Sequence, residues 1–360
     1  MSAAAGMRVV VLGGTGNFGA RICRALAGDR DLEVIAAARR GAPARLDLDS
    51  PGLERDLVRL APGLVIHCAG PFQGQDYRVA LASLAAGAHY LDLADARAFV
   101  ARFADALDAP ARAAGRIALS GASTLPALSA AVVDALAARL ASIDSIRIAI
   151  APGQRAPRGA ATIAGVLSYA GRPFRWLSGG EWRTVHGWQA LERVRFAFGT
   201  RWAAACDVPD LELFPARYPG VRTVEFRAAL EIGAQHFALW AAAALRRAGV
   251  ALPLERGAAT LDRVARLMDV LGGERGGMRV ALEGARADGT RARVEWQLTA
   301  DAMHGPEIPC MAALVLARKL ARGALRETGA FACMGFLELA ELEREFAKWS
   351  ITTVMEERSA

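Results

Sequence analysis

The sequence predicts an α/β protein, with a doubly wound parallel sheet in its N-terminal part and a second, α+β domain built on a mainly antiparallel sheet. Three observations support this fold class. Short apolar runs alternate with helix-like segments over residues 7–123, and a glycine cluster separates the first run from the first helix. Strands with an alternating pattern, including a hairpin, follow in the second half.

The N-terminal part contains six apolar runs separated by amphipathic or turn-like segments. The predicted strands are 7–13, 32–39, 44–50, 63–72, 89–95 and 116–123, and the predicted helices are 17–28, 51–62, 76–88 and 96–115. Continuous apolar strands that alternate with helices indicate a parallel sheet covered by helices on both faces. We therefore expect a first domain over residues 1–128. The helix predicted at 128–141 would connect it to the rest of the chain.

The pattern changes after this helix. We expect strands at 142–153 and 221–233, two helical stretches within 236–272, a hairpin at 277–300 and a helix at 309–325. The hairpin is centred on the letters ADGT, which contain an Asp-Gly turn signal. These elements predict an α+β domain over residues 129–325.

The most apolar stretch of the second domain is FALWAAAALRR, residues 237–247. Its uninterrupted apolar part is far shorter than the ~20 residues that span a bilayer. We interpret it as a core helix, with an interfacial or dimer-forming helix as the alternative.

Composition and charge exclude several classes of protein. The formal net charge is +7, but the arginines are scattered along the chain rather than clustered as in a nucleic-acid-binding surface. The five cysteines are widely spaced, which predicts reduced thiols and neither a zinc site nor a disulfide framework. We therefore expect no metal site. The N-terminal stretch lacks the apolar region of a signal peptide, so a cytoplasmic protein is expected.

The glycine cluster predicts a dinucleotide-binding loop. Gly14, Gly16 and Gly19 form G-x-G-x-x-G directly after a strand and at the start of a helix, which is the context that this motif requires. Gly14 is expected to permit the turn, Gly16 to let the backbone approach a pyrophosphate and Gly19 to let the helix pack closely. The helix N-terminus would attract the anion. The remaining residues of the predicted loop are Gly13, Thr15, Asn17 and Phe18.

The end of the second strand favours NADP(H) over NAD(H). An NAD site usually has Asp or Glu there, whereas this chain has Arg39 and Arg40, whose guanidinium groups suit a 2′-phosphate. The alternative is that one arginine is only solvated surface charge. Asp47 is expected near the adenine. Ala69, Gly70, Pro71 and Phe72 follow the fourth strand, on the nicotinamide side of such sites.

Three segments together resemble the saccharopine dehydrogenase-like (saccharopine reductase-like) proteins. They are VVVLGGTGNFGARICRAL, LVIHCAGPFQGQDYRVALASLAAGAHYLDLAD and SGASTLPALSAAVVDAL. The resemblance implies an NADP-binding Rossmann domain followed by an α+β domain, with a final segment, 326–360, that packs back on the first domain. It also places Gly14, Gly16, Gly19, Arg39 and the 69–72 loop at cofactor-binding positions.

One departure from the family bears on the substrate. Family members that act on saccharopine carry Asp-Pro-Gly after the sixth strand, where this chain has Leu125-Pro126-Ala127. An apolar Leu125 has no charge to pair with an ammonium group. The resemblance therefore does not imply saccharopine as the substrate.

The sequence offers no diagnostic proton donor. Asp95 ranks first because it follows the fifth strand, where ligands bind in such sheets, although a helix N-cap is an equal alternative. No Tyr-x-x-x-Lys pair is present. The other candidates are Tyr90, Asp92, Ser120, Ser123, His186, Asp207, Tyr218 and His304. Trp176, Trp182, Trp188 and Trp202 are interpreted as core residues, with an apolar pocket as the alternative.

These observations predict an NADP(H)-dependent oxidoreductase that transfers a hydride to an imine, a ketone or an activated alkene of a small-molecule substrate bound between the domains. We expect a homodimer. The alternatives are a non-catalytic NADP-binding sensor or assembly protein, and a lipid-directed, enoyl reductase-like protein. Association with a lipid surface through the helices within 236–272 is a further possibility.

Overall fold

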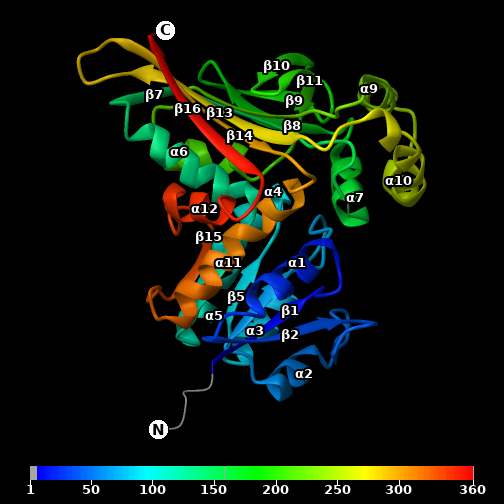
Figure 1. The fold of residues 1–360 in the computed structure, drawn as a ribbon, viewed down its shortest axis with the longest axis vertical. Coiled ribbons are helices and arrows are strands. Elements are labelled where there is room, and N and C mark those ends of the chain that lie inside the picture. Colours follow the sequence, from blue (N-terminus) through cyan, green and yellow to red (C-terminus); the bar gives the residue numbers. More distant parts are fainter. Residues whose placement is uncertain (1–5, 158, 360) are drawn as a thin grey trace. The chain divides into compact units, whose positions relative to one another are not determined.

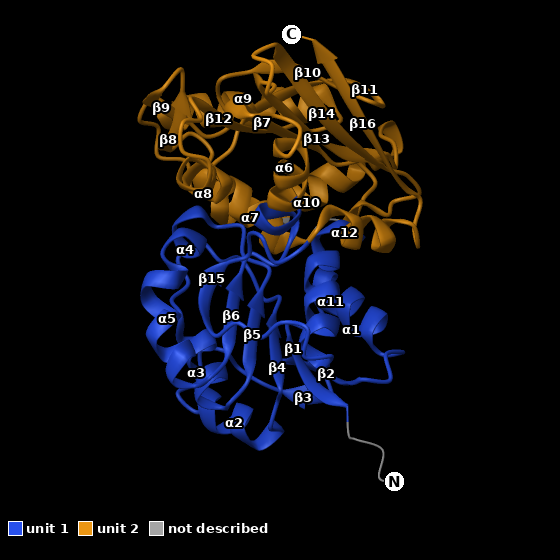
Figure 2. Cartoon of the chain, turned by 90° about the vertical axis from the view of Figure 1, so that its left-hand side faces the viewer, with its two compact units in different colours: residues 1–128, 307–337 blue, residues 129–306, 338–360 orange. Residues whose placement is uncertain are grey.

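The computed structural model describes residues 6–157 and 159–359, and the chain divides into two compact units (Figure 2). Unit 1 contains the residues up to Leu128 and the segment Glu307–Leu337, and unit 2 contains Ser129–Pro306 and the residues from Glu338 onward. The first five residues, part of the stretch used to argue against a signal peptide, lie outside the described residues.

Unit 1 is built on a seven-stranded sheet whose strands are all parallel, as expected for a doubly wound domain (Figure 1). The strand order is β15-β6-β5-β4-β1-β2-β3. The strands are β1 (Met7–Leu12), β2 (Leu32–Ala38), β3 (Ala44–Arg45), β4 (Leu64–His67), β5 (His89–Asp92), β6 (Ile117–Ser120) and β15 (Gly329–Ala332). The third strand is much shorter than the expected 44–50, because Asp47 begins a turn.

Helices flank this sheet. They are α1 (Asn17–Leu26), α2 (Leu53–Leu60), α3 (Arg78–Ala85), α4 (Arg97–Ala101), α5 (Phe103–Ala113), η1 (Thr124–Leu128) and α11 (Ile308–Ala321). The predicted helix 96–115 is thus two helices that meet at Arg102, which has non-helical backbone angles.

The helix predicted at 309–325 belongs to unit 1 and not to the second domain. This helix, α11, packs against α1, and Arg318 donates to Asp29 over 2.8 Å while Arg21 pairs with Glu307. The strand β15 that follows it pairs with β6. The expected boundary of the second domain at residue 325 therefore differs from the observed one. The helix α11 and the strand β15 belong to unit 1, and the residues from Glu338 onward belong to unit 2.

Unit 2 is built on a nine-stranded, mainly antiparallel sheet, as predicted. Its strands are β7 (Ser142–Ala151), β8 (Pro173–Ser178), β9 (Glu181–His186), β10 (Glu192–Phe196), β11 (Gly199–Ala205), β12 (Thr223–Ala228), β13 (Gly276–Ala285), β14 (Arg291–Ala300) and β16 (Ile351–Ser359). The central pair β7 and β12 is parallel, and the neighbouring pairs along the sheet are antiparallel.

The predicted hairpin is confirmed. β13 and β14 pair in register from Gly276↔Ala300 to Ala285↔Arg291, and the ADGT segment forms the turn between them. Gly289 has φ +82°, and the Asp288 carboxylate accepts the Thr290 backbone N–H over 2.9 Å. The turn therefore uses the residues that tolerate its backbone geometry.

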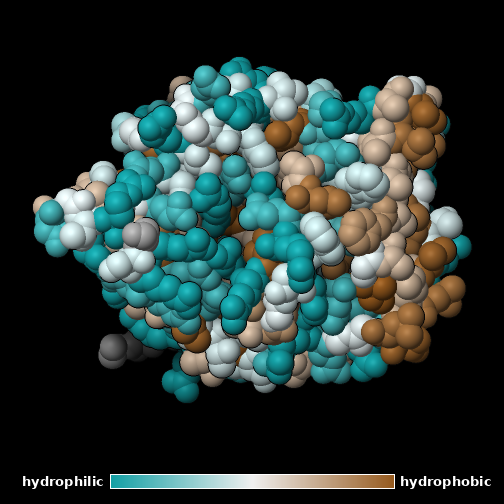
Figure 3. All heavy atoms as spheres, turned by 90° about the horizontal axis from the view of Figure 1, so that it is seen from above, coloured by the Kyte–Doolittle hydropathy of each residue, from teal (hydrophilic) through white to brown (hydrophobic). Residues whose placement is uncertain are grey.

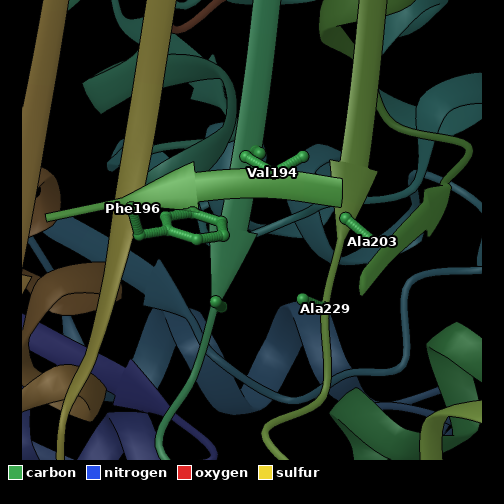
Figure 4. Close-up of a cluster of buried hydrophobic side chains, with 6 residues drawn as sticks. Val194, Phe196, Ala203 and Ala229 are labelled. Carbon is green, nitrogen blue, oxygen red and sulfur yellow. The ribbon is translucent and has the colours of Figure 1, made fainter. Parts of the chain in front are cut away.

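The two faces of the sheet carry different side chains. On one face Ile148, Val280 and Trp296 are buried, and α6 (Ser129–Ala137) packs against the same strands. The β10–β11 hairpin crosses part of the sheet, and Val194 and Phe196 pack in one cluster with the small residues of β7 (Figure 4). This close packing depends on alanine and glycine positions in the strands beneath. Those positions are Ala149, Ala151 and Gly277. A Cβ on Gly277 would lie 2.7 Å from the Phe198 ring.

The remaining helices of unit 2 are α7 (Ala160–Tyr169), α8 (Asp210–Arg217), α9 (Gly233–Arg247), η2 (Leu254–Gly257), α10 (Ala258–Leu267), η3 (Asp269–Leu271) and α12 (Leu339–Phe346). The interpretation of 237–247 as a core helix is wrong, because only His236 and Ala243 of α9 are buried whereas Phe237 and Leu245 are exposed. None of the helices in the described ranges has the length and apolar character needed to cross a membrane.

Candidate functional site

The loops at the carboxyl ends of the unit 1 strands form the candidate site. β1 pairs with β2 on one side and with β4 on the other, so the chain reverses its direction across the sheet next to β1. Ligands of open α/β sheets bind at this switch point, outside the carboxyl ends of the strands. The glycine loop follows β1, Arg39 and Arg40 follow β2, and the 69–72 loop follows β4. The parallel order thus brings the three predicted cofactor-binding segments to one edge.

The glycine loop turns at Gly13. Gly13 has φ +76°, and the backbone N–H groups of Gly13 and Gly14 both donate to the carbonyl oxygen of Ala37 on β2. Gly14 has no positive φ; a Cβ there would lie 2.8 Å from the Cβ of Ala36. The role assigned to Gly14 is therefore corrected: Gly13 permits the turn, and Gly14 permits the close approach of the loop to β2.

The first turn of α1 has the form of an anion cradle. Its N-cap residue, Gly16, has extended backbone angles and no side chain to cap the helix, and no acidic residue lies in the first turn. A Cβ on Gly19 would lie 2.3 Å from the carbonyl oxygen of Gly13, so the absence of a side chain lets the helix begin directly against the turn. A helix N-terminus placed in this way attracts a phosphate group through its N–H groups and its dipole.

Two arginines and no carboxylate follow β2. Arg39 and Arg40 are exposed, and within the described ranges neither forms an ion pair. Glu33, the acidic residue of β2, pairs with Arg8 over 3.0 Å. Asp47 lies on the exposed turn after β3 and accepts the Asp49 N–H over 3.2 Å. The guanidinium groups therefore remain available to an anion beside the glycine loop.

The loop after β4 is fixed from within unit 1. The Gln75 side-chain amide donates to the carbonyl oxygens of Ala69 and Pro71, at 2.9 and 2.8 Å. The Phe72 ring is buried and meets the His67 ring edge-on at 4.9 Å between centroids. Ala69 also lies against Gly13, where a Cβ would be 3.0 Å from its backbone nitrogen. The 69–72 loop is thus a rigid wall beside the glycine turn.

A buried carboxylate joins the ends of β5 and β6. Oδ1 of Asp92 accepts hydrogen bonds from the Ala94 N–H, the Gly121 N–H and the Ser120 hydroxyl, at 3.0, 2.8 and 3.0 Å. Burial raises the pKa of Asp92 to about 6, although these hydrogen bonds oppose the rise. Asp92 and Ser120, two of the candidate proton donors, are therefore fixed in the interior and hold the strand ends together.

Two titratable groups near this carboxylate, His67 and Cys68, are neutral. Burial lowers the pKa of His67 to about 4, and its Nδ1 shares a 3.0 Å hydrogen bond with the Tyr90 hydroxyl. Burial also raises the pKa of the Cys68 thiol well above its usual value. A neutral histidine and a protonated thiol serve as packed residues here rather than as a base and a nucleophile.

Asp95 is exposed at the same edge. The side-chain amide of Gln73 donates to Oδ1 of Asp95 over 3.4 Å. The N-cap alternative is wrong, because the N-cap residue of α4 is Ala96 and the helix has no side-chain cap. Asp95 is therefore an accessible carboxyl group near the predicted nicotinamide side, free of a helix-capping role.

Two of the four candidate donors of unit 2 have other roles in that unit. Tyr218 donates to Asp134, which also binds Arg217, and Nδ1 of His304 accepts the Ser350 N–H over 3.0 Å. Of the four tryptophans, Trp176 and Trp188 are buried whereas Trp182 and Trp202 are exposed. They are not all core residues, and the exposed pair lies on the surface of unit 2.

Unit 2 has a charged cleft of about 540 Å³ beside the β10 strand. Arg279 donates two hydrogen bonds of 2.7 Å to Glu295, which also binds Arg293 at 3.2 Å. These pairs lower the pKa of Glu295 below its usual range, although burial opposes the shift. The cleft is lined by Arg195, Phe196, Ala197, Arg279, Arg293, Glu295, Gln297, Val354, Glu356 and Arg358. The paired charges form a cross-strand network on the sheet.

The described residues hold no group of three or more His, Cys, Asp or Glu side chains that would bind a metal ion.

Solved structures with the same arrangement are known. Apo saccharopine dehydrogenase (L-Glu forming) from Saccharomyces cerevisiae matches with a TM-score of 0.68 and 13% identity, over 98% of this chain and 100% of that one. DAP dehydrogenase of C. glutamicum, in complex with DAP, matches at 0.51 and 17% identity, over 94% and 96% of the two chains. An engineered D-amino acid dehydrogenase bound to NADP+ matches at 0.50 and 17% identity, with the same coverage.

The chain has a saccharopine dehydrogenase-like Rossmann fold. This finding confirms, at the level of the fold, the resemblance inferred from the three sequence segments. No protein-family model matches the chain, and no curated protein matches it.

Sequence reasoning missed two structural supports of the candidate site. The first is β2, whose Ala36 leaves room for Gly14 and whose Ala37 carbonyl oxygen accepts two loop N–H groups. The run of alanines in AAARR was a usable signal, since small residues allow close backbone approach. The second is Gln75, which orders the 69–72 loop and lies in no recognisable motif.

We expect the substitution Asp92→Asn to change how stability depends on pH. The folded-state pKa of Asp92, about 6, lies above its unfolded value of 3.8, so ionisation costs folding energy and wild-type stability falls as the pH rises between these values. From pH ~4 to pH ~7, D92N should gain on the order of 2–3 kcal/mol relative to the wild type. Urea denaturation across this range measures the difference, and parallel pH profiles would contradict the assignment.

We expect Gly19→Ala to separate α1 from the glycine turn. The added Cβ would meet the Gly13 carbonyl oxygen at 2.3 Å, and relief of this clash should cost about 1–3 kcal/mol and move the N–H groups of the cradle. Gly28→Ala is the matched control, because its Cβ meets nothing within 4 Å. Thermal unfolding and NADPH titration should both change for G19A and stay unchanged for G28A; equal behaviour of the two variants would refute the prediction.

Proposed function

We propose that the protein is an NADP(H)-dependent oxidoreductase that transfers a hydride to an imine, a ketone or an activated alkene. The observation that carries the proposal is the pairing of an uncapped helix N-terminus at Gly16 with Arg39 and Arg40 at the end of the adjacent strand. A pyrophosphate fits the first feature and a 2′-phosphate fits the second.

The side chains after β2 support the phosphate-bearing cofactor. A carboxylate that bound a ribose 2′-hydroxyl would repel a 2′-phosphate, and none stands at residues 36–40. The two exposed guanidinium groups have no competing acidic partner among the described residues. Charge-assisted hydrogen bonds from arginine to phosphate are roughly twice as strong as neutral ones, so this difference favours NADP(H).

Each part of the site has a distinct task under this proposal. The glycine loop would hold the pyrophosphate, Asp47 would lie beside the adenine, and the 69–72 loop would form the wall on the nicotinamide side. The cofactor supplies the hydride. Reduction of a C=N or C=O group also consumes a proton, and Asp95, oriented by Gln73, is the accessible carboxyl group that would supply it.

The names of the similar structures favour an amine and imine pair as the substrate class. Two of them are an L-Glu-forming saccharopine dehydrogenase and a D-amino acid dehydrogenase, which both handle amino acids by name. Leu125 is 5% exposed and apolar, so it offers no charge for a substrate ammonium group at that position. We therefore propose an imine-reducing activity on a substrate other than saccharopine.

The cofactor assignment predicts a selective loss of affinity. Replacement of both Arg39 and Arg40 by alanine should weaken NADPH binding by about 10–100-fold, because two charged hydrogen-bond donors to the 2′-phosphate are lost. NADH affinity should change by less than about threefold. Arg45→Ala is the matched control, as Arg45 is an exposed arginine one strand away. Equal losses of affinity for NADPH and NADH would show that the two arginines do not bind the 2′-phosphate.

The activity itself is tested by NADPH oxidation against panels of keto acids with amines, simple ketones and enoyl thioesters. We expect turnover with the first panel, and we expect Asp95→Asn to lower kcat by about 10²-fold or more with little effect on NADPH affinity. Tight NADPH binding without oxidation across all panels would instead identify a non-catalytic cofactor-binding protein.

A further inference from the structure

Helix α9 exposes an apolar face. Exposed apolar residues along this helix recur at intervals of three and four, which places them on one side. They are Ala234, Phe237, Ala238, Ala241, Leu245 and, directly after the helix, Ala248. Phe237 also meets the exposed Trp202 ring of β11 at 6.0 Å between centroids. A helix on a solvated surface normally presents polar residues on this side.

Helix α10 exposes its larger apolar side chains. It is held to the rest of unit 2 by the Gln154 amide, which donates 2.9 Å hydrogen bonds to the backbone carbonyl oxygen of Ala265 and, in the turn after the helix, to Asp269. Its outer side carries Leu261 and Val264, each about half exposed, and Leu267, which is 78% exposed. In the following turn Val270 is 77% and Leu271 72% exposed. The side with the larger apolar residues therefore faces away from the core of unit 2.

These residues form one surface, which we name the α9–α10 face. It consists of Trp202, Phe237, Leu245, Val250, Leu261, Val264, Leu267, Val270 and Leu271. Figure 3 shows apolar residues gathered along the right-hand side of the molecule, where α9 and α10 lie in Figure 1. Contiguous exposed apolar patches of this kind mark surfaces that are covered by a partner.

The uncompensated charge around this face is positive. Glu255 binds Arg172 and Arg246 at 3.0 and 2.8 Å, and Asp262 binds Arg266 at 2.7 Å, so these two acidic residues are already paired. Arg247, Arg256 and Arg263 are exposed, and no acidic side chain in the described part of the chain pairs with them. They lie on the same helices and turns as the apolar residues.

We propose that the α9–α10 face binds an anionic lipid surface. Leucine, valine and phenylalanine side chains would enter the boundary between head groups and acyl chains, while the arginines meet the anionic head groups. A two-fold contact between copies would instead bring the same unpaired arginines toward one another, which like-charge repulsion disfavours. The binding is peripheral. The proposal does not depend on the oxidoreductase activity, because it rests on unit 2 alone.

Flotation of the full-length protein with vesicles tests the proposal. The protein should float with phosphatidylcholine vesicles that contain phosphatidylglycerol, at least tenfold more than with phosphatidylcholine alone, and added salt should reduce the bound fraction. The double variant Leu267→Glu, Leu271→Glu should abolish flotation. Val58→Glu, at a similarly exposed apolar position on α2 of unit 1, is the matched control and should float like the wild type. Arg256→Ser and Arg263→Ser should each weaken binding about fivefold.

Circular dichroism and thermal unfolding confirm that each variant is folded before flotation. Three results would overturn the proposal. They are a wild type that stays unbound, equal binding to both kinds of vesicle, and a wild-type dimer in light scattering that L267E/L271E converts to a monomer without any vesicle binding. The last result would show that a second copy covers the face.

Discussion

The contact on which the site depends is the approach of α1 to the turn at the end of β1. Gly19 stands so close to the Gly13 carbonyl oxygen that any side chain at Gly19 would force the helix away, and a Cβ on Gly14 would lie only 2.8 Å from the Cβ of Ala36 on β2. This packing sets the helix N-terminus at the sheet edge, beside the arginines that follow β2. The switch in strand order at β1 then leaves space for a ligand at that edge.

Much of unit 1 follows from local patterns. The apolar runs and their glycine-bounded helices predicted a parallel sheet and the position of its first strands along the chain, because a parallel strand buried on both faces leaves a continuous apolar signature. The glycine cluster and AAARR predicted which loops meet at the carboxyl ends of neighbouring strands, and binding of a cofactor by these loops stays a prediction. The hairpin turn at ADGT could also be predicted from the sequence, since Gly289 supplies the positive φ that the turn requires.

Other features depend on contacts between distant residues. The placement of α11 in unit 1 is fixed by its packing on α1 and by pairs such as Arg318 with Asp29, which a local pattern does not contain. The role of Asp92 depends on the neighbouring strand β6, since two of its donors, Ser120 and Gly121, lie 28 and 29 residues further along the chain. The exposure of Leu261, Val264 and Leu267 on α10 is likewise absent from the local pattern, because it depends on how the helix packs in unit 2.

The central claim is that NADP(H) binds at the glycine loop and is recognised by Arg39 and Arg40. Amide hydrogen exchange of the wild-type protein with saturating NADPH and with saturating NADH tests it most directly. The account predicts protection of residues 13–20 by both cofactors and protection of the segment 38–45 by NADPH alone. Protection that is absent from the glycine loop, or identical at 38–45 for the two cofactors, would contradict it.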